Sequence, residues 1–154
     1  MVLQVGVKVL LKNSQGKYLL VRRNPKKYPE VGPKWDIVGG RINPGFILME
    51  NLKREVKEET GLELSIEPKL AAAQDIFVRR YADDADLNKE LSEEKIERHV
   101  VRLTYIGEIE GEPNNLGDDH LEVKWFTAQE IKAMDVNILD SYFKELVDRG
   151  VVVL

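Results

Sequence analysis

The stretch GGRINPGFILMENLKREVKEETGL, residues 39–62, predicts a glycine turn that leads into a helix rich in carboxylates. Aliphatic residues recur every four positions from Leu48 to Val56, which places one apolar stripe along a helix of residues 47–60. Gly61 follows as a C-cap, because glycine enters the left-handed conformation without steric cost. The stretch therefore specifies a tight turn and an amphipathic helix in that order.

The carboxylates of this helix are crowded onto one side. Glu55, Glu58 and Glu59 fall within a sector roughly 100° wide, and like charges at this spacing repel one another. A divalent cation would offset that repulsion, and Mg²⁺ prefers oxygen ligands. By itself the run KREVKEE is more typical of a solvated helix face. The glycine turn at a fixed interval before it favours a metal-binding helix instead.

The rest of the chain predicts an α/β protein with one domain spanning residues 1–154, a length sufficient to bury a core. The turn NSQG at 13–16 joins the first two strands as a hairpin. The acidic insert at 81–97 is expected to be a solvated loop. Strands are expected at 3–11, 17–23, 35–38, 62–67, 71–78, 98–110 and 121–127, and further helices at 128–134 and 138–149.

The composition excludes several classes of protein. The chain is 43% hydrophobic and 32% charged, as in ordinary globular proteins, and its net charge of −4 gives no basic field for a nucleic acid polymer. The lack of cysteine excludes disulfides, thiolate zinc sites and cysteine nucleophiles. No apolar run is long enough to span a bilayer, and the signal-peptide pattern is missing. We therefore expect a cytoplasmic protein with no membrane partner.

Residues 40–62 resemble the Nudix box, G-x5-E-x7-R-E-U-x-E-E-x-G-U, in which U is an aliphatic residue. The hairpin strand LLVRR, the tryptophan before the Gly-Gly turn and the late strand EVKWFT also resemble this family, although more loosely. The resemblance implies an α/β/α sandwich with a mixed sheet. It also implies hydrolysis of a nucleoside diphosphate linked to another moiety, with Mg²⁺ or Mn²⁺. The matching positions are Gly40, Arg54, Glu55, Val56, Glu58, Glu59, Gly61 and Leu62.

Carried over position by position, the resemblance implies a metal site and a base. Glu55 is a candidate base as well as a ligand, and Arg54 would orient its carboxylate. Asp119, or His120 beside it, is a further candidate base, although a surface turn is the more common role for either residue. The expected metal ligands are the carbonyl of Gly39 and the carboxylates of Glu55, Glu58 and Glu59.

The resemblance also suggests contacts for a nucleotide-type small-molecule substrate. Arg22 and Arg41 are candidate phosphate contacts, as are Arg23 and Arg79, although exposed arginines often have no such role. Trp35 is a candidate platform for a base, although a tryptophan at such a position more often packs in the core.

Phe46 departs from the box, because the family has a glutamate at this position. That glutamate supports the metal helix in the family, so its loss favours an alternative function, a catalytically weakened nucleotide-binding or interaction module. The isopentenyl diphosphate isomerases of the same family use a cysteine that this chain lacks. The consecutive apolar residues Phe46 to Met49 cannot all face inward from a helix, so they predict a homodimer contact.

Overall fold

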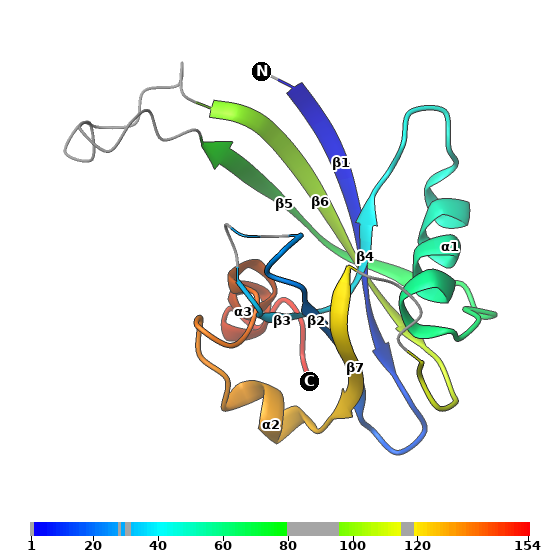
Figure 1. Cartoon of the computed structure of the whole chain (residues 1–154). Coiled ribbons are helices and arrows are strands. Elements are labelled where there is room, and N and C mark those ends of the chain that lie inside the picture. The colour runs from blue at the N-terminus through cyan, green and yellow to red at the C-terminus, as the bar shows by residue number, and fades with distance from the viewer. Residues whose placement is uncertain (1, 28, 30–31, 80–95, 115–118) are drawn as a thin grey trace.

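The computed structural model describes residues 2–27, 29, 32–79, 96–114 and 119–154. Within these residues it contains a seven-stranded sheet and helices on both of its faces (Figure 1). No helix of the described part has the length and apolar character needed to cross a bilayer. In chain order the elements are β1 (Val2–Lys12), β2 (Tyr18–Arg23), β3 (Trp35–Asp36), β4 (Val38–Arg41), α1 (Leu48–Thr60), β5 (Lys69–Arg79), β6 (Ile96–Glu108), β7 (His120–Phe126), α2 (Ala128–Lys132) and α3 (Ser141–Asp148).

The sheet is mixed, as predicted, because β1 pairs parallel with β6 while its other partners run antiparallel. The strands follow the order β3-β2-β1-β6-β5, with β4 paired to β1 and β7 paired to β2. One edge of β1 is divided between two strands. Gly6–Val9 pair with β4, whereas Leu11 and Lys12 pair with β2. The hairpin strands therefore diverge, and the Gly-Gly segment of β4 lies beside the middle of β1.

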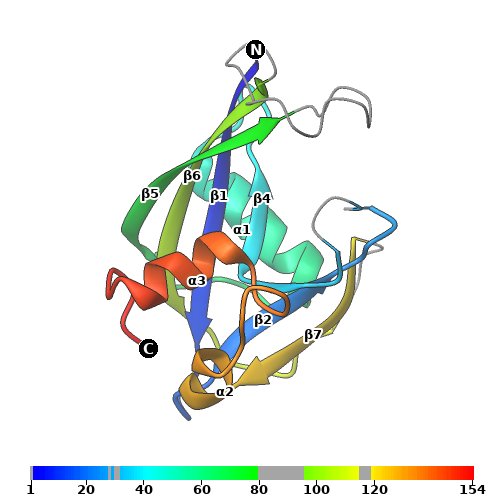
Figure 2. The ribbon, with the colours of Figure 1, turned by 90° about the vertical axis from the view of Figure 1, so that its left-hand side faces the viewer.

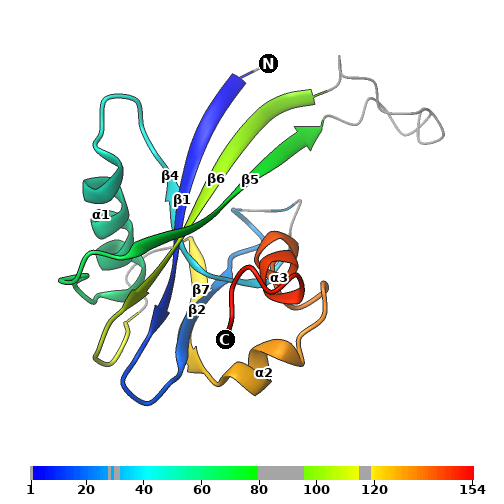
Figure 3. The same cartoon turned by 180° about the vertical axis from the view of Figure 1, so that it is seen from behind.

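The helices form the outer layers of the predicted α/β/α sandwich. Helix α1 covers one face of the sheet, and α2 and α3 lie on the opposite face (Figures 2 and 3). Successive side chains of β1 point to opposite faces of the sheet and so contribute to both cores. Val7 and Val9 pack in the core under α1, and Leu10 packs in the core under α3. Helix α1 contributes Leu52 and Val56 to its core, which are the stripe that its sequence period predicts.

Helix α1 confirms the predicted helix and its C-cap, because it runs over Leu48–Thr60 and Gly61 has a φ of 74°. The strand expected at 35–38 is divided, since β3 ends at Asp36 and β4 begins at Val38. The predicted strand at 62–67 is wrong. That segment is a connection in which Leu64 anchors to the core while Ile66 stays 60% exposed.

The predicted C-terminal helix at 138–149 begins late, at Ser141. Asp140 is its N-cap, because a side-chain oxygen of Asp140 accepts a hydrogen bond from the backbone N–H of Phe143. Leu139 lies before the helix and forms a bridge with Trp35. Most of the acidic insert predicted at 81–97 lies outside the described residues.

Candidate active site

The site begins at the Gly-Gly segment of β4, which pairs with β1. Gly39 pairs with Lys8 and has a φ of 140°. A Cβ atom on Gly39 would lie 2.0 Å from the carbonyl oxygen of Val7, so only glycine fits. A Cβ atom on Gly40 would meet the carboxylate of Glu55 at 3.0 Å. These glycines therefore let a carboxylate of α1 lie directly against the sheet.

Glu59 is the most deeply placed of the box glutamates, with an exposed fraction of 8%. Its Oε2 accepts a hydrogen bond of 2.9 Å from the backbone N–H of Gly39. Its Oε1 lies 3.7 Å from Nε2 of His120, at the start of β7. Burial raises the pKa of Glu59 to about 8, although Lys8 and the Gly39 N–H favour the charged form. Burial, with a smaller contribution from Lys8, lowers the pKa of His120 to about 4.

Glu55 and Glu58 are joined by Arg54 on the more exposed side of α1. Nη2 of Arg54 lies 3.4 Å from Oε1 of Glu55, and Nη1 lies 3.1 Å from Oε1 of Glu58. Burial raises the pKa of Glu55, and the charge of Glu58 adds to that shift. The side chain of Glu58 is 56% exposed, whereas that of Glu55 is only 17% exposed. Arg54 therefore lies where the sequence expects it, beside the carboxylate that it is predicted to orient.

Two carboxylates of the site have the chemistry that a hard divalent cation prefers. Glu55 and Glu59 are carboxylates with raised pKa values, and the charge of Glu55 raises the pKa of Glu59 further. A cation between them would stabilise the charged form of both carboxylates. Within the described residues, no three acidic, histidine or cysteine side chains are gathered closely enough to hold an ion. The carbonyl of Gly39 accepts a hydrogen bond of 3.3 Å from Nζ of Lys8. The remaining ligands would thus have to come from Glu58, this carbonyl and water.

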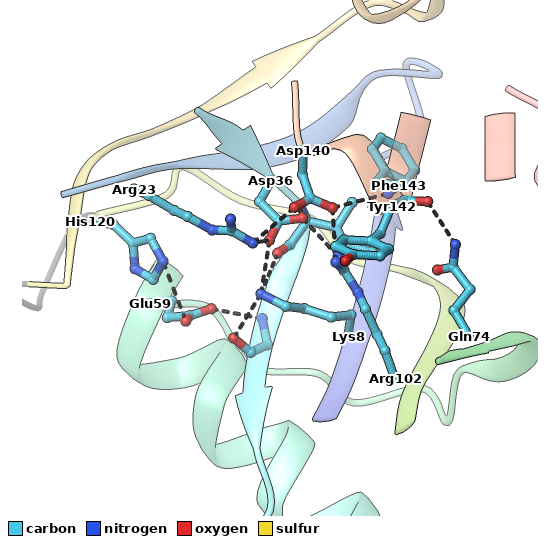
Figure 4. Close-up of polar contacts among 12 residues, drawn as sticks. Lys8, Arg23, Asp36, Glu59, Gln74, Arg102, His120, Asp140, Tyr142 and Phe143 are labelled. Carbon is cyan, nitrogen blue, oxygen red and sulfur yellow. Dashed lines mark hydrogen bonds and ion pairs between the residues drawn. The ribbon is translucent and has the colours of Figure 1, made fainter. Parts of the chain in front are cut away.

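A buried ionic network adjoins the site on the α3 side, and sequence reasoning missed it (Figure 4). Asp36 binds Arg23 and also Nη2 of Arg102 at 2.8 Å. Asp140 accepts from Arg102 at 2.8 Å and from Arg23 at 3.1 Å. Nζ of Lys8 lies 3.1 Å from Oδ2 of Asp36, so this lysine is shared between the network and the Gly39 carbonyl. The three cations hold the pKa of Asp36 well below its usual range, despite burial.

The signals for this network were weak but present in the sequence. Arg102 stands in the apolar run VVRLT of β6, where a fully charged residue is unusual unless it is paired. Asp140 precedes an amphipathic segment, which is the position of an N-cap. Arg23 was a candidate phosphate contact, and in the structure its guanidinium is bound to Asp36 and Asp140 instead.

Two further candidate residues, Asp119 and Arg22, form ion pairs at the surface. Asp119 is exposed and 3.4 Å from Nζ of Lys27, yet its charge raises the pKa of Glu55, so it lies near the site. Arg22 forms a surface pair with Glu122 at 2.6 Å.

Trp35 belongs to the core rather than to the carboxylate cluster. It is 9% exposed and packs edge-on against Phe126, with a ring centroid distance of 4.7 Å. Arg41 is exposed at the end of β4. The structure therefore brings Glu55, Glu59, Gly39 and His120 together, and it does not bring Trp35 to them.

Proteins of known structure share this fold. A MutT protein from Methanosarcina mazei Go1 superposes with a TM-score of 0.71 at 26% identity, over 96% of this chain and 92% of that one. A NUDIX hydrolase from Nitrosomonas europaea gives a TM-score of 0.69 at 20% identity, over 96% of this chain and 87% of that one, which supports the fold alone. The molecule thus has the MutT-type α/β/α sandwich that the sequence predicts.

The chain belongs to the Nudix family, since the sequence model of the NUDIX domain matches residues 2–146. A nucleoside triphosphatase, NudI, from Enterobacter sp. (strain 638) is 26% identical over 126 residues, which are 80% of this chain and 82% of that protein. A putative 8-oxo-dGTP diphosphatase from Bacillus subtilis (strain 168) is 35% identical over 69 residues, or 45% of this chain and 42% of that protein. The predicted Nudix pyrophosphohydrolase is thereby confirmed at the level of the family.

Proposed function

We propose that this chain is a divalent-metal-dependent hydrolase that cleaves the pyrophosphate bond of a nucleoside diphosphate linked to another moiety. The substrate would be a nucleoside triphosphate, a sugar nucleotide or a dinucleotide, and Mg²⁺ or Mn²⁺ would be the metal. The observation that carries this proposal is the pair of partly desolvated carboxylates, Glu55 and Glu59, set beneath Gly39 and Gly40. The names of the relatives support a nucleotide substrate.

The glutamates of α1 and the Gly39 carbonyl would have the main parts in this reaction. When bound, the divalent ion would neutralise the diphosphate and lower the pKa of the attacking water. Glu59, fixed by the Gly39 N–H, and Glu55, fixed by Arg54, would hold that ion, with Glu58 and the Gly39 carbonyl completing the set. Glu55 would take the proton of the attacking water. Asp119, which directly precedes β7 and adds to the raised pKa of Glu55, is the alternative base.

The test is a panel of nucleoside triphosphates, sugar nucleotides, ADP-ribose and dinucleoside polyphosphates, each assayed with Mg²⁺ and with Mn²⁺. We expect turnover of at least one class, and we expect Glu55→Gln to reduce it at least a hundredfold, about 2.7 kcal/mol or more of transition-state stabilisation. Glu50→Gln, on an exposed position of the same helix, is the matched control and should leave the rate unchanged. An equal rate for wild type and Glu55→Gln would contradict the proposal.

A nucleotide-binding or interaction module is the second candidate, and Phe46 is the observation that favours it. Its side chain is 56% exposed and cannot supply the carboxylate that the Nudix box has at this position. Tight nucleotide binding without hydrolysis in either metal would select the module over the enzyme. The two candidates share the same fold and the same acidic site, so they differ only in turnover. The substrate panel measures hydrolysis, and a separate nucleotide-binding measurement identifies binding without hydrolysis.

We also propose that residues 1–154 act as one domain, in the cytoplasm, without a membrane or nucleic acid polymer as partner.

The predicted homodimer contact would consist of Phe46 and Ile47, which are 56% and 63% exposed. Leu48 and Met49 would not take part, because they pack against the core under α1. Light scattering at high protein concentration tests this contact, and a monomer would contradict it.

A further inference from the structure

Position 46 offers no hydrogen-bond acceptor to Arg54, because Phe46 stands where the Nudix box has a glutamate. Phenylalanine has no hydrogen-bond acceptor, and Phe46 precedes α1, with 56% of its surface exposed. Arginine carries only donors, and the side chain of Arg54 is 40% exposed, so many orientations are open to its guanidinium. The alignment of Arg54 with the carboxylates of α1 therefore requires some other fixed partner.

That partner is Asn51, one turn earlier on the same helix. Nη2 of Arg54 donates to Oδ1 of Asn51 at 3.0 Å, which is shorter than its 3.4 Å contact with Glu55. Residues three apart on a helix are neighbours, so the backbone itself places the two side chains together. The same guanidinium reaches Glu58 through Nη1 at 3.1 Å. Asn51 thus binds one branch of the Arg54 fork while the other branch binds Glu58.

Asn51 is itself held in place. Its exposed fraction is 0%, so its side chain has no freedom to turn into solvent. Its Nδ2 lies 3.4 Å from the carbonyl oxygen of Arg41, at the end of β4. This carbonyl accepts and the guanidinium donates, so the orientation of the amide is fixed from both ends. A buried polar side chain satisfied at both ends is rigid, and it connects the glycine turn to Arg54.

We propose that Asn51 is a positioning residue of the metal site, and that it supplies to Arg54 the acceptor that Phe46 cannot supply. The role rests on the proposed metal-dependent function, because Arg54 acts on Glu55 and Glu58. Without the amide oxygen, the guanidinium turns to solvent, and the repulsion between these carboxylates is less well compensated. Loss of an outer partner of this kind typically costs ten- to a hundredfold in metal affinity or activity.

The test compares Asn51→Ala with Asn51→Asp. Alanine removes both contacts and still suits a helix, whereas aspartate keeps an acceptor for Arg54 and loses the donor to Arg41. Mn²⁺ affinity is measured by calorimetry or electron paramagnetic resonance without nucleotide, together with kcat and KM on the substrate found in the panel. We expect Asn51→Ala to weaken Mn²⁺ binding about tenfold and to lower kcat with little change in KM. Asn51→Asp and the control Phe46→Ala should stay within about threefold of wild type.

Several outcomes would overturn this role. Equal losses in Asn51→Ala and Asn51→Asp would assign the effect to the Arg41 contact, and wild-type affinity in Asn51→Ala would remove the role altogether. A wild type that binds no Mn²⁺ and hydrolyses nothing would refute the proposed function instead. The inference keeps its own readout in that case, because ¹⁵N relaxation of the Arg54 side chain in the metal-free protein must show greater motion in Asn51→Ala than in wild type.

Discussion

Glu59 should make the metal-free protein less stable as the pH rises above neutrality. In the folded protein its carboxyl keeps a proton up to a pH of about 8, whereas an unfolded glutamate releases it near 4.5. Between these values the folded state holds more protons than the unfolded state, so the free energy of unfolding falls with rising pH. Each unit of difference in pKa is worth about 1.4 kcal/mol.

His120 opposes this trend over part of the range. Its folded imidazole stays neutral down to a pH of about 4, whereas an unfolded histidine gains a proton near 6.5. Between these values the unfolded state holds the extra proton, and stability rises with pH. The two slopes cancel between pH 4.5 and pH 6.5. From pH 6.5 to pH 8 only Glu59 of these two groups still contributes a slope, which lowers the free energy of unfolding by about 2 kcal/mol, or about 4–8 °C in melting temperature.

The assay is thermal or urea unfolding in chelator from pH 5 to pH 8, with wild type, Glu59→Gln and the control Glu50→Gln. Glutamine keeps an oxygen for the Gly39 N–H and does not ionise, so Glu59→Gln should show no fall above pH 6.5. Saturating Mg²⁺ should remove the fall in wild type, because an ion bound to the folded state stabilises it by mass action. Parallel curves for wild type and Glu59→Gln above pH 6.5 would refute the reasoning.

Two further substitutions test the framework around the site. Gly39→Ala should separate β4 from β1 and lower the melting temperature sharply, because its Cβ would lie 2.0 Å from the Val7 carbonyl, while Gly6→Ala, with a 3.5 Å contact, should fold normally in the same scan. Arg102→Met should cost about 3–5 kcal/mol in urea unfolding, because it leaves the buried carboxylates of Asp36 and Asp140 undercompensated, and an effect no larger than that of the exposed control Arg149→Met would contradict this.

The helix of the site was predictable from sequence because its determinants are local. The four-residue period from Leu48 to Val56 fixes which side is buried, and Gly61 fixes where the helix ends. The same period places Glu58 and Glu59 on one side, but it does not give their depth. The structure makes them very different, since the side chain of Glu58 is 56% exposed and that of Glu59 is 10% exposed. The difference arises because β4 and β7 cover the carboxylate of Glu59, through Gly39 and His120. Helical periodicity carries no information about these strands.

The error at 62–67 has a similar origin. Alternating apolar residues predict a strand when a neighbouring strand is available to pair with them, and a sequence does not state whether such an edge is free. Here the segment connects the end of α1 to the start of β5, and Leu64 alone reaches the core with an exposed fraction of 4%. The local sequence pattern therefore correctly predicted the burial of Leu64 and wrongly predicted that residues 62–67 pair as a strand.

The ionic network is the part of the site that sequence could least reveal, because its members come from four strands and the N-cap of α3. Lys8, Arg23 and Arg102 each lie in a strand, where a charged residue normally marks the solvent-facing side. In the sheet β1 lies between β2 and β6, and this arrangement gives the three cations Asp36 and Asp140 as partners. Since the ammonium of Lys8 also binds the carbonyl of Gly39, the network fixes one side of the turn on which Glu59 depends. The box residues alone therefore do not define the candidate site, because part of its geometry is set by charges buried on the other face of the sheet.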